Sequence, residues 1–140
     1  MSVFTPDEIE YLTSQTLARL ATVGPDGRPH VIPVTFTFND EEDAIDVGGI
    51  AFAKGKKWRD ASQNQKVTLL VDDVIPEPRR ARAVEIRGDA DTGGDRINPR
   101  FRNFTPEFLR IRPKRIVSWG VEEHEGTDAA GMRTNARSVG

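Results

Sequence analysis

The fold is decided by residues 17–34, which read LARLATVGPDGRPHVIPV. Residues 17–23 alternate in character with a period of two, which is typical of a strand with one buried face. The next four residues, Gly-Pro-Asp-Gly at 24–27, are turn formers. Residues 30–38 are again dense in Val, Ile, Thr and Phe, the residues that strands favour. The stretch therefore predicts a β-hairpin.

Upstream of this hairpin, local chemistry predicts a helix from Pro6 to about Ser14. Thr5 is placed as its N-cap, and Glu8 stands where it closes a capping box. Downstream, we predict a short polar helix at 56–63 and further strands at 44–48, 66–72, 82–90 and 115–121. Residues 105–112 fit either a turn of helix or an extended arm.

Six short antiparallel strands usually close on themselves, because a barrel leaves no exposed sheet edge. We therefore predict a mainly β (α+β) fold. It is a six-stranded antiparallel barrel with a short N-terminal helix and small accessory helices. This domain occupies residues 1–121, and residues 122–140 form a polar C-terminal tail.

Pro33 interrupts the second strand of the hairpin, because proline cannot donate a hydrogen bond to a β-ladder. The position fits a plain sheet edge, a bulge, or a place where the strand faces a ligand. Val31, Pro33 and Thr35 share one face, which would offer a flat and mostly apolar surface to a planar ring. For the two flanking residues, packing in the core is an equally good interpretation.

Composition excludes much common enzyme chemistry. The chain has no cysteine and only two histidines, so we expect no disulfide, no thiolate nucleophile and no metal site. Its net charge of −2 gives no reason to bind nucleic acid or an anionic membrane. Basic residues cluster at 54–59, 79–82 and 110–115, which suits a small polyanionic ligand. An acidic N-terminus without a long apolar run predicts a soluble cytoplasmic protein.

Three segments together resemble a known family. They are residues 17–34, the basic stretch KGKKWRD at 54–60 followed by NQKV at 64–67, and the closing RPKRIVSWG at 112–120. In order and spacing they are similar to the flavin and deazaflavin split-barrel superfamily. The closest likeness is to the branch named after pyridoxamine 5′-phosphate oxidase (PPOX class) that uses the deazaflavin coenzyme F420.

The resemblance implies a six-stranded split barrel that forms a homodimer, with the cofactor in a groove between subunits. It implies that the ring lies along Val31 to Phe36, and so beside Val31, Pro33, Val34 and Thr35. Residues 50–57 would bind the cofactor phosphate, with Lys57 the best match and Ile50, Ala51, Lys54 and Lys56 beside it. Trp119 matches a tryptophan next to the ring.

The implied activity is hydride transfer between reduced F420 and an unsaturated small organic substrate. Because the cofactor carries the reactive centre, no dedicated catalytic residue is assigned, and water is the expected proton donor. Two alternatives remain: the same fold using FMN, and a non-catalytic protein that binds F420 or a flavin. Absorbance of the purified protein separates the two cofactors.

Two departures from the family pattern bear on the activity. The flavin-using oxidases tend to have Ser-Arg-Lys where this chain has Gly55-Lys56-Lys57, so a hydroxyl donor to the phosphate is missing. Pyridoxamine 5′-phosphate oxidases also carry Arg-x-His after the tryptophan. Here the run is Gly-Val-Glu-Glu-His-Glu at 120–125, without the arginine. Oxidation of the vitamin is therefore not expected.

Overall fold

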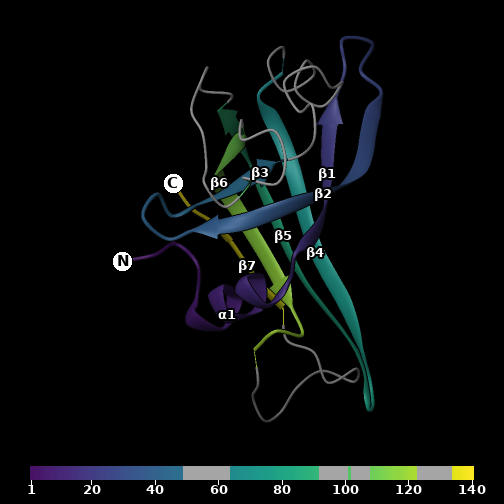
Figure 1. Ribbon diagram of the computed structural model, residues 1–140, viewed down its shortest axis with the longest axis vertical. Helices are drawn as coiled ribbons and strands as arrows, with labels where there is room; N and C mark the ends of the chain where they lie inside the picture. The colour runs from purple at the N-terminus through teal and green to yellow at the C-terminus, as the bar shows by residue number, and fades with distance from the viewer. Residues whose placement is uncertain (49–63, 92–100, 102–107, 123–133) are drawn as a thin grey trace.

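The computed structural model describes residues 1–48, 64–91, 101, 108–122 and 134–140. This part of the chain forms one helix and seven strands (Figure 1). They are α1 (Pro6–Ser14), β1 (Leu17–Val23), β2 (Pro29–Asn39), β3 (Ala44–Gly48), β4 (Lys66–Pro76), β5 (Arg79–Asp91), β6 (Leu109–Trp119) and β7 (Thr134–Ser138). None of the described helical residues forms a segment long and apolar enough to cross a membrane.

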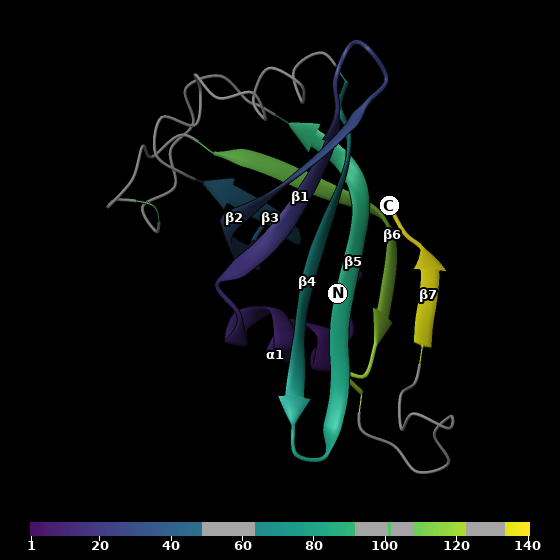
Figure 2. The same cartoon turned by 90° about the vertical axis from the view of Figure 1, so that its right-hand side faces the viewer.

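The first six strands form a closed antiparallel barrel. Their order is β3-β2-β1-β4-β5-β6, and a further pairing between β3 and β6 joins the two ends. β7 adds to the outer side of β6, where Figure 2 shows it in yellow at the edge of the sheet. The predicted six-stranded barrel is therefore confirmed, and β1 and β3 begin and end where the sequence predicts.

The core is built from the inward-facing residues of the alternating strands. Leu20, Leu69, Ile86 and Ile116 lie opposite one another on β1, β4, β5 and β6, and all four are fully buried. One row of aliphatic side chains therefore crosses four strands, so a shift of one residue in any pairing would expose it. This explains why the polar-apolar alternation of the sequence specifies the register.

The barrel is split along one half of β2. Within the described part of the chain, residues 29–35 of β2 pair with β1 and residues 35–39 pair with β3, so Thr35 alone has a partner on both sides. Pro33 lies in the half with a single neighbour, opposite Arg19. On the side of β2 away from β1, no described strand pairs with Pro33, so the missing N–H of proline interrupts no described ladder there. This agrees with the interpretation of the position as a sheet edge.

α1 is tied to the end of the chain by a buried carboxylate. The Thr5 hydroxyl accepts from the Glu8 N–H and the Glu8 carboxylate accepts from the Thr5 N–H, which is the predicted capping box. Glu8 is fully buried and also accepts hydrogen bonds from Ser118 and from Arg137, whose Nη2 lies 2.6 Å from Oε1. Burial acts to raise the pKa of Glu8. Hydrogen bonds from Arg137, Ser118 and Thr5 outweigh burial and hold the pKa below its ordinary value.

Several strands differ from the sequence prediction. β7 lies within the predicted polar tail, where no strand is expected because its five residues contain one apolar side chain, Ala136. β6 begins at Leu109, so the segment that fits a helix or an extended arm is extended from there on. β4 continues past Asp72, and β5 begins before Arg82. Together they form a hairpin arm of residues 73–82 that projects beyond α1 in Figures 1 and 2. The helix predicted at 56–63 lies outside the described residues.

The Glu8–Arg137 pair gives a pH-dependent prediction. The lowered pKa of Glu8 means that the pair stabilises the fold above the ordinary carboxyl value of 4.5, and that this contribution is lost as the pH falls through the folded-state pKa. We expect Arg137→Met to lower the free energy of unfolding by about 3 kcal/mol at pH 7, because it leaves a buried charge without its partner. The deficit should shrink towards pH 4, as Glu8 becomes protonated.

Urea unfolding at both pH values measures this effect. Arg115→Met is the control, since Arg115 lies on β6 with an outward side chain and should change stability by no more than about 0.5 kcal/mol. An equal deficit at pH 7 and pH 4 would show that the interaction is not electrostatic.

Candidate functional site

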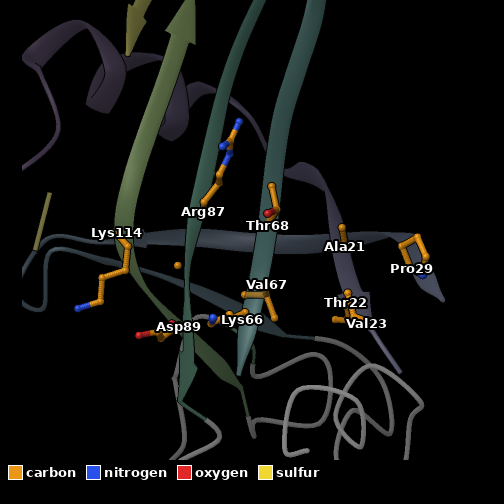
Figure 3. Close-up of a pocket in the computed structure, with 11 residues that line it drawn as sticks. Ala21, Thr22, Val23, Pro29, Lys66, Val67, Thr68, Arg87, Asp89 and Lys114 are labelled. Atoms are coloured by element: carbon orange, nitrogen blue, oxygen red, sulfur yellow. The ribbon is translucent and has the colours of Figure 1, made fainter. Parts of the chain in front are cut away.

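An open groove of about 440 Å³ lies on the outer face of the barrel (Figure 3). It crosses β1, β4, β5 and β6 at the end of the sheet where β4 begins. Its lining is Ala21, Thr22, Val23, Pro29, Lys66, Val67, Thr68, Arg87, Gly88, Asp89 and Lys114. Most of the exposed lining is apolar, which suits a flat organic ring.

A β-bulge shapes this groove. The pairing of β5 with β6 shifts between Arg87 and Gly88, which lie opposite Arg115 and Pro113, so Lys114 is the extra residue. A Cβ atom on Gly88 would lie 2.3 Å from the Arg112 carbonyl oxygen, so only glycine fits beside this backbone. Lys114 and Arg115 are consequently both directed away from the core, and Figure 3 shows Lys114 at the groove.

The charges around the groove are mainly positive. Three of its side chains are cationic, Lys66, Arg87 and Lys114, against the single carboxylate of Asp89. Arg87 is engaged by Glu85, with Nε 2.8 Å from the carboxylate oxygen. Neither lysine ammonium makes a hydrogen bond or ion pair with a described residue. Two unpartnered cations above an apolar floor favour a ligand with both a ring and an anionic group.

Sequence-predicted residues on β2 extend the same outer face. Val31 lies directly opposite Ala21 of the groove, and Pro33 and Thr35 follow on the same side of the strand. Val31 is 68% exposed and Ile32 is 38% exposed, although both are aliphatic. Val31 therefore lies beside the groove on the outer face, whereas Ile32, opposite the buried Leu20, lies on the other face of the strand.

The other predicted site residues have different surroundings. The Val34 side chain is buried in the core, so only its backbone could face a ligand. The Thr35 hydroxyl donates to the carbonyl of Gly48 over 3.4 Å. The predicted phosphate-binding residues Ile50, Ala51, Lys54, Lys56 and Lys57 lie outside the described residues.

Trp119 is far from β2 within one chain. It ends β6 opposite Ala83 of β5. Through β1, β4 and β5, Val31 is in register with Arg115 of β6, so Trp119 lies four residues, roughly 13 Å, further along that strand. A single ring therefore cannot contact both Trp119 and Val31 of the same copy.

One arginine from each of two basic clusters has a structural role. Arg110 is buried and donates from Nε to Asp46 over 2.9 Å, and this hydrogen bond raises the pKa of Arg110. Arg82 donates to both carboxylate oxygens of Asp73 and lies over the ring of Tyr11, with 4.8 Å from Cζ to the ring centroid. Neither guanidinium is available to a ligand in the groove.

Sequence reasoning missed the two groove lysines. Lys66 and Lys114 lie in two of the segments that carry the resemblance, 64–67 and 112–120, but neither is assigned a role there. They meet only because four strands and a bulge bring them together. The one available signal is an isolated lysine at the first residue of an apolar strand.

Comparison with known proteins assigns the chain to a family. Residues 5–100 match the family pyridoxamine 5′-phosphate oxidase. A curated relative from Streptomyces rimosus, a 5a,11a-dehydrotetracycline/5a,11a-dehydrooxytetracycline reductase, is 42% identical over 123 residues, covering 85% of this chain and 84% of that protein.

Solved structures share the fold at low identity. A FAD binding protein from Mycobacterium smegmatis has a TM-score of 0.59 and 23% identity over 82% of this chain and 93% of its own. A heme binding protein from the same organism has a TM-score of 0.66 and 13% identity, covering 99% of this chain and 60% of its own. Because these proteins are named for different ligands, the likeness shows the fold alone.

The bulge gives a test of the groove. We expect Gly88→Ala to lower the free energy of unfolding by about 2 kcal/mol, because the new methyl group has to displace the backbone at Arg112. Gly27→Asn is the control: Gly27 has a φ of +79° and open space around it, and asparagine tolerates that conformation at a cost below about 1 kcal/mol. Urea unfolding of both variants measures the difference. An unchanged Gly88→Ala protein would mean that the two strands do not approach this closely.

Proposed function

The chain belongs to the pyridoxamine 5′-phosphate oxidase family, and we propose that it is an oxidoreductase that transfers a hydride from reduced coenzyme F420 to an unsaturated small organic substrate. The observation that carries the proposal is the 42% identity to a reductase whose name gives dehydrotetracyclines as its substrates. A dehydro compound has the unsaturation that a hydride donor reduces. The apolar groove with its two unpartnered lysines supports a cofactor that is both planar and anionic.

The residues present fit such a cofactor. Val31 and Pro33 offer an exposed apolar strand face beside the groove, on which a tricyclic ring can lie flat. We assign the phosphate to residues 50–57, which precede Lys66 of the groove in the chain. F420 carries a phosphodiester and an oligoglutamate tail. Its several charges therefore call for more cations than the phosphate segment alone supplies, and Lys66 and Lys114 meet that requirement.

The chain contributes binding and orientation rather than acid–base chemistry. When bound, the reduced deazaflavin supplies the hydride. Among the described lining residues Asp89 is the one carboxylate, and neither histidine nor tyrosine is present. Tyr11 donates instead to Asp73, and burial followed by that hydrogen bond raises its pKa far above the ordinary value. Tyr11 is therefore no proton donor, and water supplies the proton at the substrate.

Two copies are needed to surround one ring. Trp119 lies four residues along β6 from Arg115, the residue in register with Val31, yet the resemblance gives both Val31 and Trp119 a place beside the ring. We therefore assign the active form to a cytoplasmic homodimer that buries the outer face. β2 of one copy and β6 of the other then flank each groove.

FMN is the second candidate cofactor, because solved structures with this fold include proteins named for FAD binding. The missing hydroxyl donor at Gly55 weighs against FMN. A non-catalytic F420 carrier is the third candidate. Titration of the purified chain with F420 and with FMN, followed by fluorescence, separates the cofactors. We expect F420 to bind at least tenfold more tightly, and the reverse order would replace F420 by FMN.

Lys57→Ala tests the phosphate assignment. Loss of a charge-assisted contact worth about 1.5 to 3 kcal/mol should weaken F420 binding by roughly tenfold to a hundredfold and leave stability almost unchanged. Higher salt should weaken the wild-type complex more than the variant complex, because exposed phosphate contacts are screened.

Arg79→Ala is the charge-matched control for Lys57→Ala. Arg79 is exposed at the tip of the hairpin arm, opposite Pro76, at the far end of β5 from the groove. Lys66 is unsuitable as a control, since it lines the groove. Equal binding by Lys57→Ala and wild type would place the phosphate elsewhere.

A third prediction concerns the dimer. Val31→Asp puts a charge on the outer face next to the groove and should convert the dimer to monomer at micromolar concentration. Val74→Asp is the matched control, because Val74 is 50% exposed but lies on the hairpin arm. Sedimentation velocity distinguishes the two. A wild-type monomer, or a Val31→Asp dimer as stable as wild type, would contradict the shared groove.

A further inference from the structure

A second cavity, unlike the groove, lies between α1 and the hairpin arm. It has a volume of about 360 Å³, and its exposed lining is mostly polar. Asp7, Glu10 and Tyr11 of α1 form one wall, Arg80 and Arg82 of β5 form the other, and Val121 completes it. Arg80 and Asp89 are nine residues apart on β5, roughly 30 Å, so this cavity is separate from the groove.

The opposite charges around this cavity do not neutralise one another. Within the described part of the chain, Arg80 forms no ion pair, and neither does the Asp7 or the Glu10 carboxylate. The Arg80 Nε is buried without a hydrogen-bond acceptor. Native proteins rarely leave a buried charged donor unsatisfied, because the cost is a few kcal/mol. An anionic group in the cavity would supply the counter-charge that this guanidinium lacks among the described residues.

The wall next to Arg80 is rigid. Arg82 is held by Asp73 through two hydrogen bonds of 2.9 and 2.6 Å, and Tyr11 donates to the same carboxylate over 2.9 Å. These groups satisfy one another, so Arg82 cannot turn to pair with Asp7 or Glu10. The cavity is thus a fixed space with a cationic donor on the arm and free carboxylates on the helix.

We propose that this cavity binds a small zwitterion of the α-amino acid type. Its carboxylate accepts from Arg80, its ammonium group donates to Asp7 or Glu10, and an aliphatic portion contacts Val121. A singly charged ligand would leave one wall unpaired. The volume is at the lower end of small-molecule sites, which suits a ligand of this size. The proposal does not depend on the coenzyme or on the reaction.

Ligand-observed NMR with each of the twenty standard L-amino acids at millimolar concentration tests the proposal. We expect at least one to bind. Its deaminated acid, which lacks the ammonium group, and its decarboxylated amine, which lacks the carboxylate, keep one charge each and should bind at least tenfold more weakly. Absence of binding by all twenty, or equal binding by either analogue, would overturn the proposal.

Variants locate the site. Arg80→Met should weaken binding at least tenfold, whereas Arg79→Met, at the exposed neighbouring position, should leave it unchanged. The double variant Asp7→Asn with Glu10→Gln should also weaken binding and keeps the fold, since both carboxylates are exposed. Undiminished binding in both Arg80→Met and the double variant would show that the amino acid binds elsewhere and would refute the assignment. Because F420 titration of the same variants should match wild type, a failure here is distinct from a failure of the proposed function.

Discussion

The structure depends on the way β2 divides its hydrogen bonds. Its second half pairs with β3, and the β3–β6 pairing then closes the barrel around the aliphatic row of Leu20, Leu69, Ile86 and Ile116. Its first half has β1 alone as a described neighbour, and there Val31 to Pro33 stay exposed. The division that completes the core therefore also creates the apolar surface beside the groove. Pro33 suits this half, because it has no N–H to leave unpaired.

Charge is distributed by the same topology. Arg110 forms a buried ion pair with Asp46, and Arg82 pairs with Asp73 on the hairpin arm. Glu8 pairs with Arg137, and this ion pair holds α1 against β7. Lys66 and Lys114 are left without partners among the described residues, and both face the groove. Cations that are not needed for folding thus lie where an anionic ligand could use them.

Sequence predicts the elements whose signals are local. The alternation at 17–23, the turn at 24–27 and the capping box at Thr5 and Glu8 each specify structure within a few residues, and all appear in the fold. The first half of β6 escapes prediction because Arg110 is buried there by a partner distant in sequence, Asp46. The groove cannot be predicted for the same reason. Lys66 and Lys114 are distant in sequence, and only the pairing of β4, β5 and β6 brings them to one groove. The resemblance adds an expectation that the local signals lack, namely that a ring lies along Val31 to Phe36.

Transfer of an isotope tests the central claim most directly. Reduced F420 carrying deuterium at the hydride-donating carbon is mixed with the purified chain and a 5a,11a-dehydrotetracycline, the substrate class of the 42% identical relative, in a single turnover. The account predicts that the reduced product contains deuterium at carbon and that no transfer occurs without the protein. A bound coenzyme that stays reduced, or a product without deuterium, would contradict an F420-dependent reductase.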